Sequence, residues 1–294
     1  MSLYGESFHL NYCSKNSLFI SMLASIIVFI LLSISSLSQA ETIYFSDDFE
    51  SGNFSKWASR NPNVTIQSDR VHKGTKAIHI PYDLEAIGPD HQDNNRHVIA
   101  DLTSKNLSHF FLHGCFNISS SVAPPRVYSP TTRRKLFYIF SEDYYRQGRW
   151  DIILGALGGE KGKTGDIYPL SITIGSNYYP NYSDLRTGAS FASGLIKVDQ
   201  WHCLELEAKL NTPNVSDGLV RVWLDGVLVY ERLNISIRSD NRALGVIQVG
   251  TQIDRSGDSE ERHEDRYWDD IIISDTINSS LRPSPPTQVN AQQE

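Results

Sequence analysis

Among the side chains of this sequence that can act as general acids or bases, three are of interest: His97, His113 and Tyr138. His113 lies in the run 109–118, where its neighbours two residues away share one face and large apolar residues occupy the other. Histidine and tyrosine both suit proton transfer to or from a substrate. A single histidine on a strand is also common as a partnered structural residue, so both interpretations stay open.

Residues 200–233 indicate what kind of element would position such side chains. Two runs alternate between apolar and polar residues at a period of two, which is typical of half-buried strands rather than helices. The apolar face consists of Leu204, Leu206, Ala208 and Leu210 in the first run and of Val220, Val222 and Leu224 in the second. Asp225-Gly226 favours the positive φ angles of a tight turn. We therefore expect an antiparallel hairpin with one face on a core.

Short strands of the same kind follow one another through the chain. The other expected strands are 42–49, 64–67, 77–81, 96–102, 109–118, 133–141, 150–157, 169–175, 244–253 and 267–274. Polar, glycine-rich or highly charged sequence predicts loops at 88–95, 158–166 and 254–265. Past residue 40, no run of ten or more residues keeps a helical period. About a dozen short strands with turn residues between them predict an all-β antiparallel sandwich.

Residues 1–40 are expected to be a signal peptide. The run 18–37 is apolar or serine without a charge, and Ser38-Gln39-Ala40 has the small-x-small form of a cleavage site. The alternative is an uncleaved membrane anchor, because the apolar run is about long enough to cross a bilayer. Either interpretation places residues 41–278 outside the cytoplasm: secreted, periplasmic or on the cell surface. Residues 279–294 are polar and proline-rich, which predicts a tail or linker.

The charge distribution restricts the partners. The formal net charge is −7, and the longest basic cluster is Arg133-Arg134-Lys135. This is not the electrostatic footprint of a nucleic-acid-binding protein. An anionic ligand would need a local basic pocket, for which Arg134 and Lys135 are candidates.

Two cysteines, Cys115 and Cys203, follow the expected signal peptide. An oxidising compartment would permit a disulfide between them. Two buried thiols on separate strands are the alternative. The sequence leaves this choice open.

Three motifs in the chain resemble one family. They are Phe-x-Asp-Asp-Phe-Glu-Ser-Gly at 45–52, Trp-x-Asp-Gly-x-Leu-Val at 223–229, and Tyr-Trp-Asp-Asp-Ile-Ile-Ile-Ser at 267–274. Together they resemble the concanavalin A-like lectin/glucanase jelly roll, a superfamily with laminin-G-like binding modules, glucanases, and heparin-lyase-like and alginate-lyase-like polysaccharide lyases. The resemblance covers roughly residues 43–274. It implies a sandwich of two antiparallel sheets, one of which forms a groove for extended glycans.

A glucanase of this family would resemble Glu-x-Asp-x-x-Glu on a single strand, which holds the two carboxyls of a retaining mechanism on one face. That motif does not occur in the chain. The nearest pair is Glu205 and Glu207, for which Arg221 and Lys209 are available as ion-pair partners. We therefore expect a solvated strand face there and no glycosidase.

A lyase needs a group that neutralises the uronate carboxylate, a base for the C5 proton and an acid for the leaving oxygen. The chain is similar to the alginate lyases in strand order. By that likeness Arg96 falls on their arginine-bearing strand, while Gln248 and Gln252 on the strand 247–253 face the groove.

The chain departs from the alginate-lyase pattern at two strands. The tyrosine of the 247–253 motif is missing, and the Gln-Ile-His strand is replaced by Lys135-Leu-Phe-Tyr-Ile-Phe140. A base would have to come from His97, His113 or Tyr138. The predicted catalytic set is therefore Arg96, His113, Tyr138 and Gln248.

Aromatic side chains could contribute to glycan binding. Trp150, Trp223 and Tyr138 are candidates for stacking on a sugar, because an aromatic face suits the apolar face of a pyranose. Each could equally be an ordinary core or sheet-face aromatic. The predicted substrate-binding set consists of Trp150, Trp223, Gln252, Lys135, Arg134 and His97.

The resemblance also suggests a structural Ca²⁺, since related jelly rolls hold one near the first and last strands. Asp47 and Glu50 near the first strand, with Asp269 and Asp270 on the last, are hard oxygen donors of the kind that Ca²⁺ prefers. Solvated acidic strand ends are the alternative.

These observations predict a polysaccharide-binding jelly-roll domain outside the cytoplasm, without a complete recognisable catalytic set. The alternative is a polysaccharide lyase that cleaves a uronate-containing glycan by β-elimination. Membrane contact is expected only through an uncleaved residue 1–40 segment.

Overall fold

The computed structural model describes residues 41–83, 96–119, 133–141, 150–157, 167–168, 170–176, 196–250, 253–254 and 263–276. The predicted signal segment, the predicted tail and the predicted loops 88–95 and 158–166 lie outside these residues. Within the described ranges, no helix has the length and apolar character needed to span a membrane. The helical structure in them is one 3₁₀ turn, η2 (Thr103–Lys105).

The other elements of the described residues are β-strands. They are β1 (Ile43–Asp47), β2 (Ser59–Arg60), β3 (Thr65–Gln67), β4 (Ala77–Asp83), β5 (Val98–Asp101), β6 (His109–Ile118), β7 (Arg133–Phe140), β8 (Trp150–Leu157), β9 (Ile167–Tyr168), β10 (Leu170–Ser176), β11 (Ile196–Lys197), β12 (Trp201–Lys209), β13 (Gly218–Leu224), β14 (Val227–Ile235), β15 (Val246–Val249), β16 (Ile253–Asp254) and β17 (His263–Ser274).

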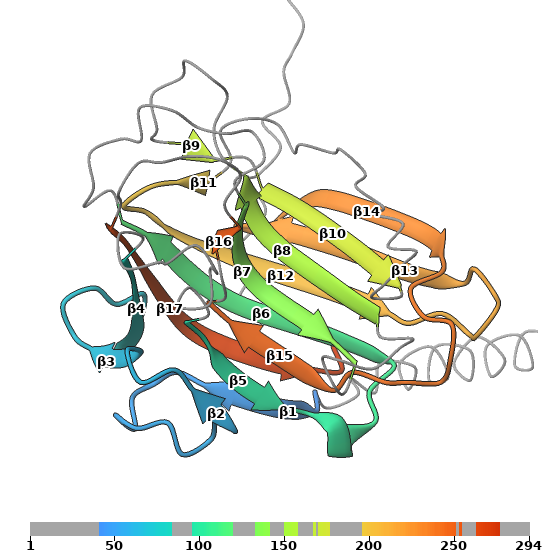
Figure 1. Ribbon diagram of the computed structural model, residues 1–294, viewed down its shortest axis with the longest axis horizontal. Coiled ribbons are helices and arrows are strands. Elements are labelled where there is room, and N and C mark those ends of the chain that lie inside the picture. The colour runs from blue at the N-terminus through green and yellow to red at the C-terminus, as the bar shows by residue number, and fades with distance from the viewer. Residues whose placement is uncertain are drawn as a thin grey trace, which may run out of the picture. The chain divides into compact units, whose positions relative to one another are not determined.

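Two antiparallel sheets form the body of the domain. Sheet A has eight strands in the order β14-β13-β12-β6-β17-β4-β3, with β1 paired to β17. Sheet B has seven strands in the order β10-β8-β7-β15-β5-β2, with β16 paired to β7. Figure 1 shows β10, β8, β7, β15 and β5 of sheet B in front of the strands of sheet A. The predicted all-β sandwich of two antiparallel sheets is therefore confirmed.

The core lies between the facing sides of the two sheets. All seven apolar residues predicted for the inner face of the hairpin are buried in it: Leu204, Leu206, Ala208, Leu210, Val220, Val222 and Leu224. Asp225 and Gly226 adopt φ angles of 51° and 78°, which confirms the tight turn. The two sheets approach closely at Gly114, where a Cβ atom would lie 2.6 Å from Cζ of Phe137 in sheet B.

The strand β17 is longer than predicted, and the expectation that residues 254–265 form only a loop is wrong. The strand begins at His263 and so includes the charged pair Glu264 and Asp265. The physical reason is that Glu264 has a partner in the interior: Arg266, which is 0% exposed, donates through Nε to Glu264 Oε1 at 2.5 Å. A charged residue can therefore sit inside this strand because its charge is compensated.

Arg266 also ties the two sheets together. Its Nη1 donates to the backbone oxygen of Lys135 in β7 at 3.2 Å, and its guanidinium carbon lies 4.1 Å above the centre of the Tyr82 ring. The contact therefore joins β17 of sheet A to β7 of sheet B at the position of Lys135.

Cys115 and Cys203 form a disulfide. They lie directly opposite each other on β6 and β12, with Cα atoms 4.0 Å apart. Of the two alternatives left open by the sequence, the disulfide is the one observed, and it indicates folding in an oxidising compartment outside the cytoplasm.

Candidate functional site

Lys135, Tyr138 and Gln248 lie together on the outer face of sheet B. Gln248 on β15 is directly opposite Tyr138 on β7, so the two side chains project to the same side. Lys135 Nζ lies 5.5 Å from the centre of the Tyr138 ring. The three side chains are 8%, 4% and 8% exposed in the order Lys135, Tyr138, Gln248. They supply a cation, a hydroxyl and an amide within one stretch of sheet.

A β-bulge in β7 makes this arrangement possible. The pairing of β7 with β8 shifts between Lys135 and Phe137, and both Leu136 and Phe137 are packed in the core. Two consecutive inward residues reset the alternation, so Lys135 and Tyr138 point outward although they are three positions apart. Bulges often re-aim side chains in this way beside functional sites.

Tyr138 is held in place by neighbours on β7 and β8. Its hydroxyl donates to Oδ2 of Asp151 at 3.2 Å, and its ring centre lies 5.1 Å from that of Phe140. With Ile153 and Val246 these aromatic rings form a small hydrophobic cluster separate from the main core. Asp151 is not among the predicted site residues, although an acidic residue inside the apolar strand 150–157 is a usable signal.

His97 and Arg96 precede β5 at the edge of the same region. Alternation with the buried Val98 and Ala100 places His97 on the outer face of sheet B. Burial lowers the pKa of His97, so its imidazole is neutral at neutral pH and can accept a proton. The Arg96 guanidinium donates instead to the backbone oxygen of Pro81 at the end of β4, in sheet A. Arg96 is therefore occupied by a structural contact.

The structure separates His113 from Tyr138 and Gln248, so the predicted convergence of all four catalytic candidates is wrong. The reason is that β6 pairs with β12 and β17 in sheet A, whereas β7 and β15 belong to sheet B. His113 does project outward from its strand, but on the other side of the sandwich.

The two tryptophans predicted to stack on sugars are not on the outer face of sheet B. Trp150 is 0% exposed in the main core, and its Nε1 donates to the backbone oxygen of Arg242 at 3.1 Å. Trp223 lies opposite Glu205 on the outer face of sheet A. The stacking role is wrong for Trp150, because both faces of its ring are buried. Trp223 lies on the outer face of sheet A, the same face as His113.

Two further predicted residues have no described side chain. Gln252 lies outside the described residues, and Arg134 is placed only as a backbone position in β7, opposite Ala156 and Ile253. Their predicted role in substrate binding stays a prediction.

The expected solvated face is wrong for Glu205 and Glu207, because each is only 7% exposed, whereas the expected partner Arg221 does pair with Glu207. Arg221 donates through Nη1 to Glu207 Oε2 at 3.0 Å and through Nε to Glu231 Oε2 at 2.6 Å. Glu205 Oε1 lies 3.9 Å from Nδ1 of His113. The two carboxylates thus face cationic or imidazole partners on the outer face of sheet A.

The four predicted calcium ligands do not converge. The strands β1 and β17 are neighbours as expected. However, Asp47 accepts from Trp57 Nε1 at 2.7 Å, and Glu50 accepts from the backbone nitrogens of Thr75 and Lys76 at 2.7 and 2.8 Å. Oxygens already bonded to protein donors and pointing to different partners do not fit a shared calcium shell.

Asp269 and Asp270 on β17 hold the segment at His72 and Lys73, where a turn is expected from Lys73-Gly74. Asp269 Oδ2 accepts from the backbone nitrogens of His72 and Lys73 at 3.0 and 3.2 Å, and Asp270 Oδ2 lies 2.7 Å from His72 Nδ1. Burial raises the pKa of Asp269 to about 6. Burial would also raise the pKa of Asp270, but the His72 contact and the Lys73 charge outweigh it and lower that pKa. No spacing in the sequence pointed to His72.

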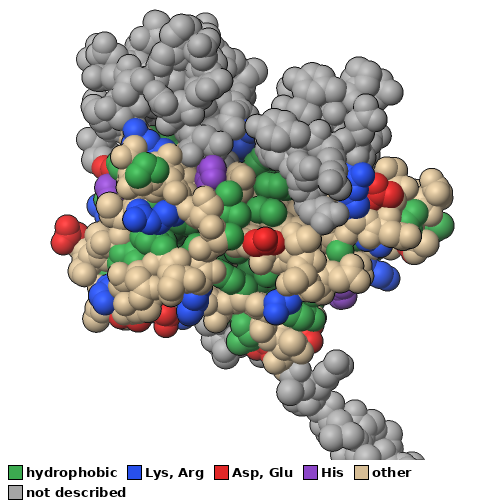
Figure 2. Space-filling view, turned by 60° about the horizontal axis from the view of Figure 1, so that its bottom comes forward, with side chains coloured by type: hydrophobic (Ala, Val, Ile, Leu, Met, Phe, Trp, Pro, Cys, Tyr) green, Lys and Arg blue, Asp and Glu red, His purple; other side chains and the backbone are tan. Residues whose placement is uncertain are grey.

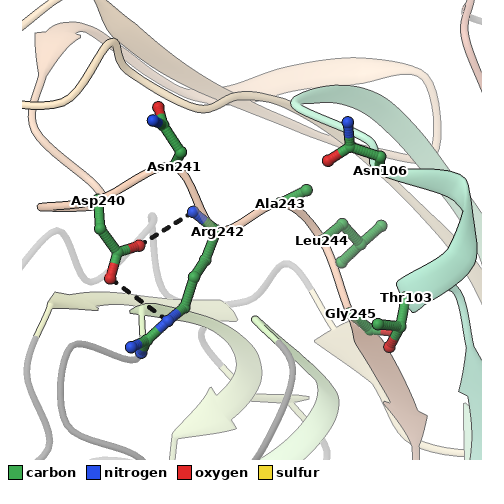
Figure 3. Close-up of a pocket in the computed structure, with 8 residues that line it drawn as sticks. All are labelled: Thr103, Asn106, Asp240, Asn241, Arg242, Ala243, Leu244 and Gly245. Carbon is green, nitrogen blue, oxygen red and sulfur yellow. Dashed lines mark hydrogen bonds and ion pairs between the residues drawn. The ribbon is translucent and has the colours of Figure 1, made fainter.

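A cavity of about 350 Å³ opens elsewhere, between η2 and the loop 240–245 (Figure 3). It is lined by Thr103, Asn106, Asp240, Asn241, Arg242, Ala243, Leu244 and Gly245. The backbone nitrogen of Arg242 donates to Asp240 Oδ1 at 2.9 Å, and its Nε lies 3.3 Å from Asp240 Oδ2. Because these two charges pair with each other, the cavity has little to select an anionic ligand, and none of the predicted site residues lines it.

Surface charge does not mark out a site by itself. On the face shown in Figure 2, Lys and Arg side chains are scattered among acidic and neutral ones. On this face no broad basic surface is available to an anionic ligand.

Known structures share this fold. An endo-β-1,4-glucuronan lyase from the fungus Trichoderma reesei superposes with a TM-score of 0.55 at 15% identity, over 80% of this chain and 96% of the lyase. A variant of alginate lyase Aly36B in complex with alginate tetrasaccharide gives 0.50 at 12% identity, over 80% and 93%. Alginate lyase vAL-1 from Chlorella virus gives 0.50 at 12%, over 79% and 99%. The concanavalin A-like jelly-roll fold suggested by the sequence motifs is thereby confirmed.

Comparison by sequence adds nothing to this: no protein-family model and no curated protein matches the chain. At 12–15% identity, the structural likeness establishes a fold shared with polysaccharide lyases and leaves the activity to the chain's own residues.

Proposed function

We propose that residues 41–276 form a domain that binds a uronate-containing polysaccharide outside the cytoplasm, along the outer face of sheet B. The observation that carries this proposal is the grouping of Lys135, Tyr138 and Gln248 on adjacent strands of one sheet face. The fold supports it, because enzymes that act on alginate and glucuronan are built on the same sandwich.

The three side chains match the groups of an acidic sugar. The Lys135 ammonium can pair with a uronate carboxylate, and a charge-assisted hydrogen bond of this kind is among the stronger ones. The Gln248 amide can donate to and accept from ring hydroxyls. The Tyr138 ring offers an apolar face to the pyranose, and its hydroxyl, bonded to Asp151, is fixed in direction.

The proposal requires that a glycan gain access to the three side chains. Lys135, Tyr138 and Gln248 are each less than one-tenth exposed, so a glycan can contact them only if their exposure increases on binding. We therefore expect association to be slower than for a rigid open groove, because an opening step precedes the contacts.

The test is binding of the full chain to alginate and glucuronan, measured by calorimetry with a neutral β-glucan as the comparison. Lys135→Ala should raise Kd for the acidic glycans about tenfold or more, since a hydrogen bond to a charged group contributes roughly 1.5–3 kcal/mol. Arg221→Ala is the matched control, because it removes one positive charge from the outer face of sheet A. Equal losses in both variants would show a general charge effect and contradict the site.

A lyase is the second candidate, favoured by the presence of His97 and Tyr138 on the same sheet face. In β-elimination the base removes the C5 proton, the electron pair forms the C4–C5 double bond, and the C4–O bond breaks as the acid protonates the leaving oxygen. Lys135 would neutralise the carboxylate, the neutral His97 would take the proton and Tyr138 would give one.

Ultraviolet absorbance of the unsaturated product separates the two candidates. New absorbance that is lost in His97→Ala and in Tyr138→Phe supports the lyase. Binding without new absorbance supports the non-catalytic module, and neither binding nor product contradicts both.

A further inference from the structure

The Cys115–Cys203 disulfide is flanked by two histidines on the outer face of sheet A, on the opposite side of the sandwich from the proposed glycan site. Cys203 Sγ lies 3.7 Å from Nε2 of His72, and Cys115 Sγ lies 3.5 Å from Nε2 of His113. His72 Nε2 and the two sulfurs all lie within 4.8 Å of one another. Sulfur and imidazole nitrogen are the ligands that zinc prefers.

Two sulfur-to-nitrogen distances match those of a tetrahedral zinc site. Zinc binds sulfur at about 2.3 Å and imidazole nitrogen at about 2.0–2.1 Å, so a tetrahedral angle separates a sulfur from a nitrogen by roughly 3.6 Å. The two observed S···N separations are 3.7 and 3.5 Å. The sulfurs themselves must move apart, which cleavage of the bond between them allows.

His72 is already oriented as a metal ligand would be. Its Nδ1 lies 2.7 Å from Asp270 Oδ2, which places a proton on Nδ1 and leaves the Nε2 lone pair directed at the sulfurs. Metal-binding histidines are commonly fixed in this way by a carboxylate behind the ring. Asp269 adds a second restraint, because it accepts from the backbone nitrogen of His72 at 3.0 Å.

His113 can fill the fourth position after its side chain moves, because its Nε2 is near Cys115 Sγ but not within 4.8 Å of all three other ligand atoms. It is on β6 two residues before Cys115, so the two side chains project from the same face of the strand, and its side chain is 7% exposed. A closed set of two sulfurs and two nitrogens is the usual form of a structural zinc site.

We propose that, when the disulfide is reduced, this domain binds one zinc ion through Cys115, Cys203, His72 and His113. A dithiol reductant supplies the two electrons: its thiolate attacks the sulfur of Cys203, a partly buried residue, and releases the Cys115 thiolate. The second thiol of the reductant then attacks the mixed disulfide, releases the Cys203 thiolate and leaves the reductant as a disulfide. The products are two protein thiols and the oxidised dithiol. Zinc binding then displaces two thiol protons to solvent. The metal thereby replaces the disulfide as the link between β6 and β12.

The test uses the full chain with Cys13→Ser, which removes the remaining thiol. After reduction with a phosphine, Co²⁺ serves as a spectroscopic probe and Zn²⁺ as its competitor. We expect one equivalent of Co²⁺ with the intense visible bands of tetrahedral coordination, displaced by Zn²⁺, and no binding to the oxidised protein. His72→Ala and His113→Ala should each weaken binding at least tenfold, and Asp270→Asn about 10–100-fold.

His79→Ala is the matched control, because His79 is also paired with an aspartate, Asp265 at 2.7 Å, and lies on the same sheet without contacting a sulfur in the described residues. Its metal affinity should equal that of the parent. Metal binding that is unchanged in both His72→Ala and His113→Ala would overturn the proposal. So would a reduced chain that loses its β-sheet circular dichroism and does not regain it with zinc, because the site requires the paired strands.

Discussion

Lys135 and Tyr138 are three residues apart in β7 and nevertheless lie on the same face of sheet B, with the Lys135 ammonium 5.5 Å from the centre of the Tyr138 ring. In a regular strand an odd spacing puts two side chains on opposite faces. The bulge at Leu136 removes that constraint. The bulge therefore brings the Lys135 cation and the Tyr138 ring to one face of the sheet.

The hydrogen bond between Tyr138 and Asp151 should contribute measurably to stability. Tyr138→Phe removes the donor and leaves the 4%-exposed Asp151 without it, so the free energy of unfolding should fall by about 1–3 kcal/mol. Urea denaturation provides the measurement. The double variant with Asp151→Asn should lose less than the sum of the two single changes; full additivity would show that the two groups do not interact.

The buried pair of Arg266 and Glu264 should respond asymmetrically to mutation. Arg266→Met leaves the Glu264 carboxylate buried without its cation, which should cost about 3–5 kcal/mol. Adding Glu264→Leu removes the uncompensated charge and should recover part of that loss. Thermal denaturation of the two variants provides the check, and a double variant less stable than Arg266→Met would contradict this account.

The buried His113 should make the domain less stable in acid. Burial lowers its pKa to about 4 from 6.5, an effect opposed by the charge of Asp270 and reinforced by those of Lys73 and His72, with Glu205 3.9 Å away. Between pH 6.5 and 4 the unfolded chain binds a proton at this site and the folded chain does not, so stability falls as the pH decreases through this window.

Burial raises the pKa of Asp269 to about 6, so protonation of Asp269 stabilises the folded state as the pH decreases through the same window. Comparison with His113→Gln cancels this opposing effect, because both proteins contain Asp269. The wild-type minus variant difference in unfolding free energy should decrease by roughly 3 kcal/mol from pH 7.5 to pH 4. A difference that is flat with pH would mean that His113 titrates alike in both states.

Gly250 should tolerate no side chain. Its φ of +69° is in the left-handed region, and a Cβ atom there would lie 2.2 Å from Ile80 Cδ1 and 3.0 Å from Trp268. Gly250→Ala should therefore lower the free energy of unfolding by roughly 1–3 kcal/mol through overpacking, in addition to the cost of the φ angle. Gly226 also has a positive φ, 78°, but it lies in the β13–β14 turn and not in the core, so Gly226→Ala should cause a smaller loss.

Local pattern was enough to predict most of the strands. Alternation at a period of two placed Leu204, Leu206 and Ala208 correctly in the core, and β6 and β8 begin and end at the predicted residues. The pattern works because one face of each antiparallel strand packs on the core, so apolar residues at every second position identify that face.

The same pattern could not predict which residues meet across strands. Alternation places His113 on the outward side of its strand, but it does not say that β6 and β7, consecutive in the chain, belong to different sheets. That assignment depends on long-range pairing. His72 and Asp151 could not be predicted for the same reason. Their partners, Cys203 and Tyr138, lie on other segments of the chain and contact them only in the folded domain.

The first and last described strands of sheet A lie side by side, and this determines how the domain would carry a mechanical load. The backbone nitrogen of Thr42 donates to Asp275 Oδ1 at 2.9 Å, and that of Asp275 donates to the Thr42 oxygen at 3.1 Å. A force applied through the chain before residue 42 and after residue 275 would therefore act at one place on the domain, the pairing of Thr42 with Asp275. Such tension would peel β1 from β17 one hydrogen bond at a time, while the rest of the sandwich remained outside the line of force.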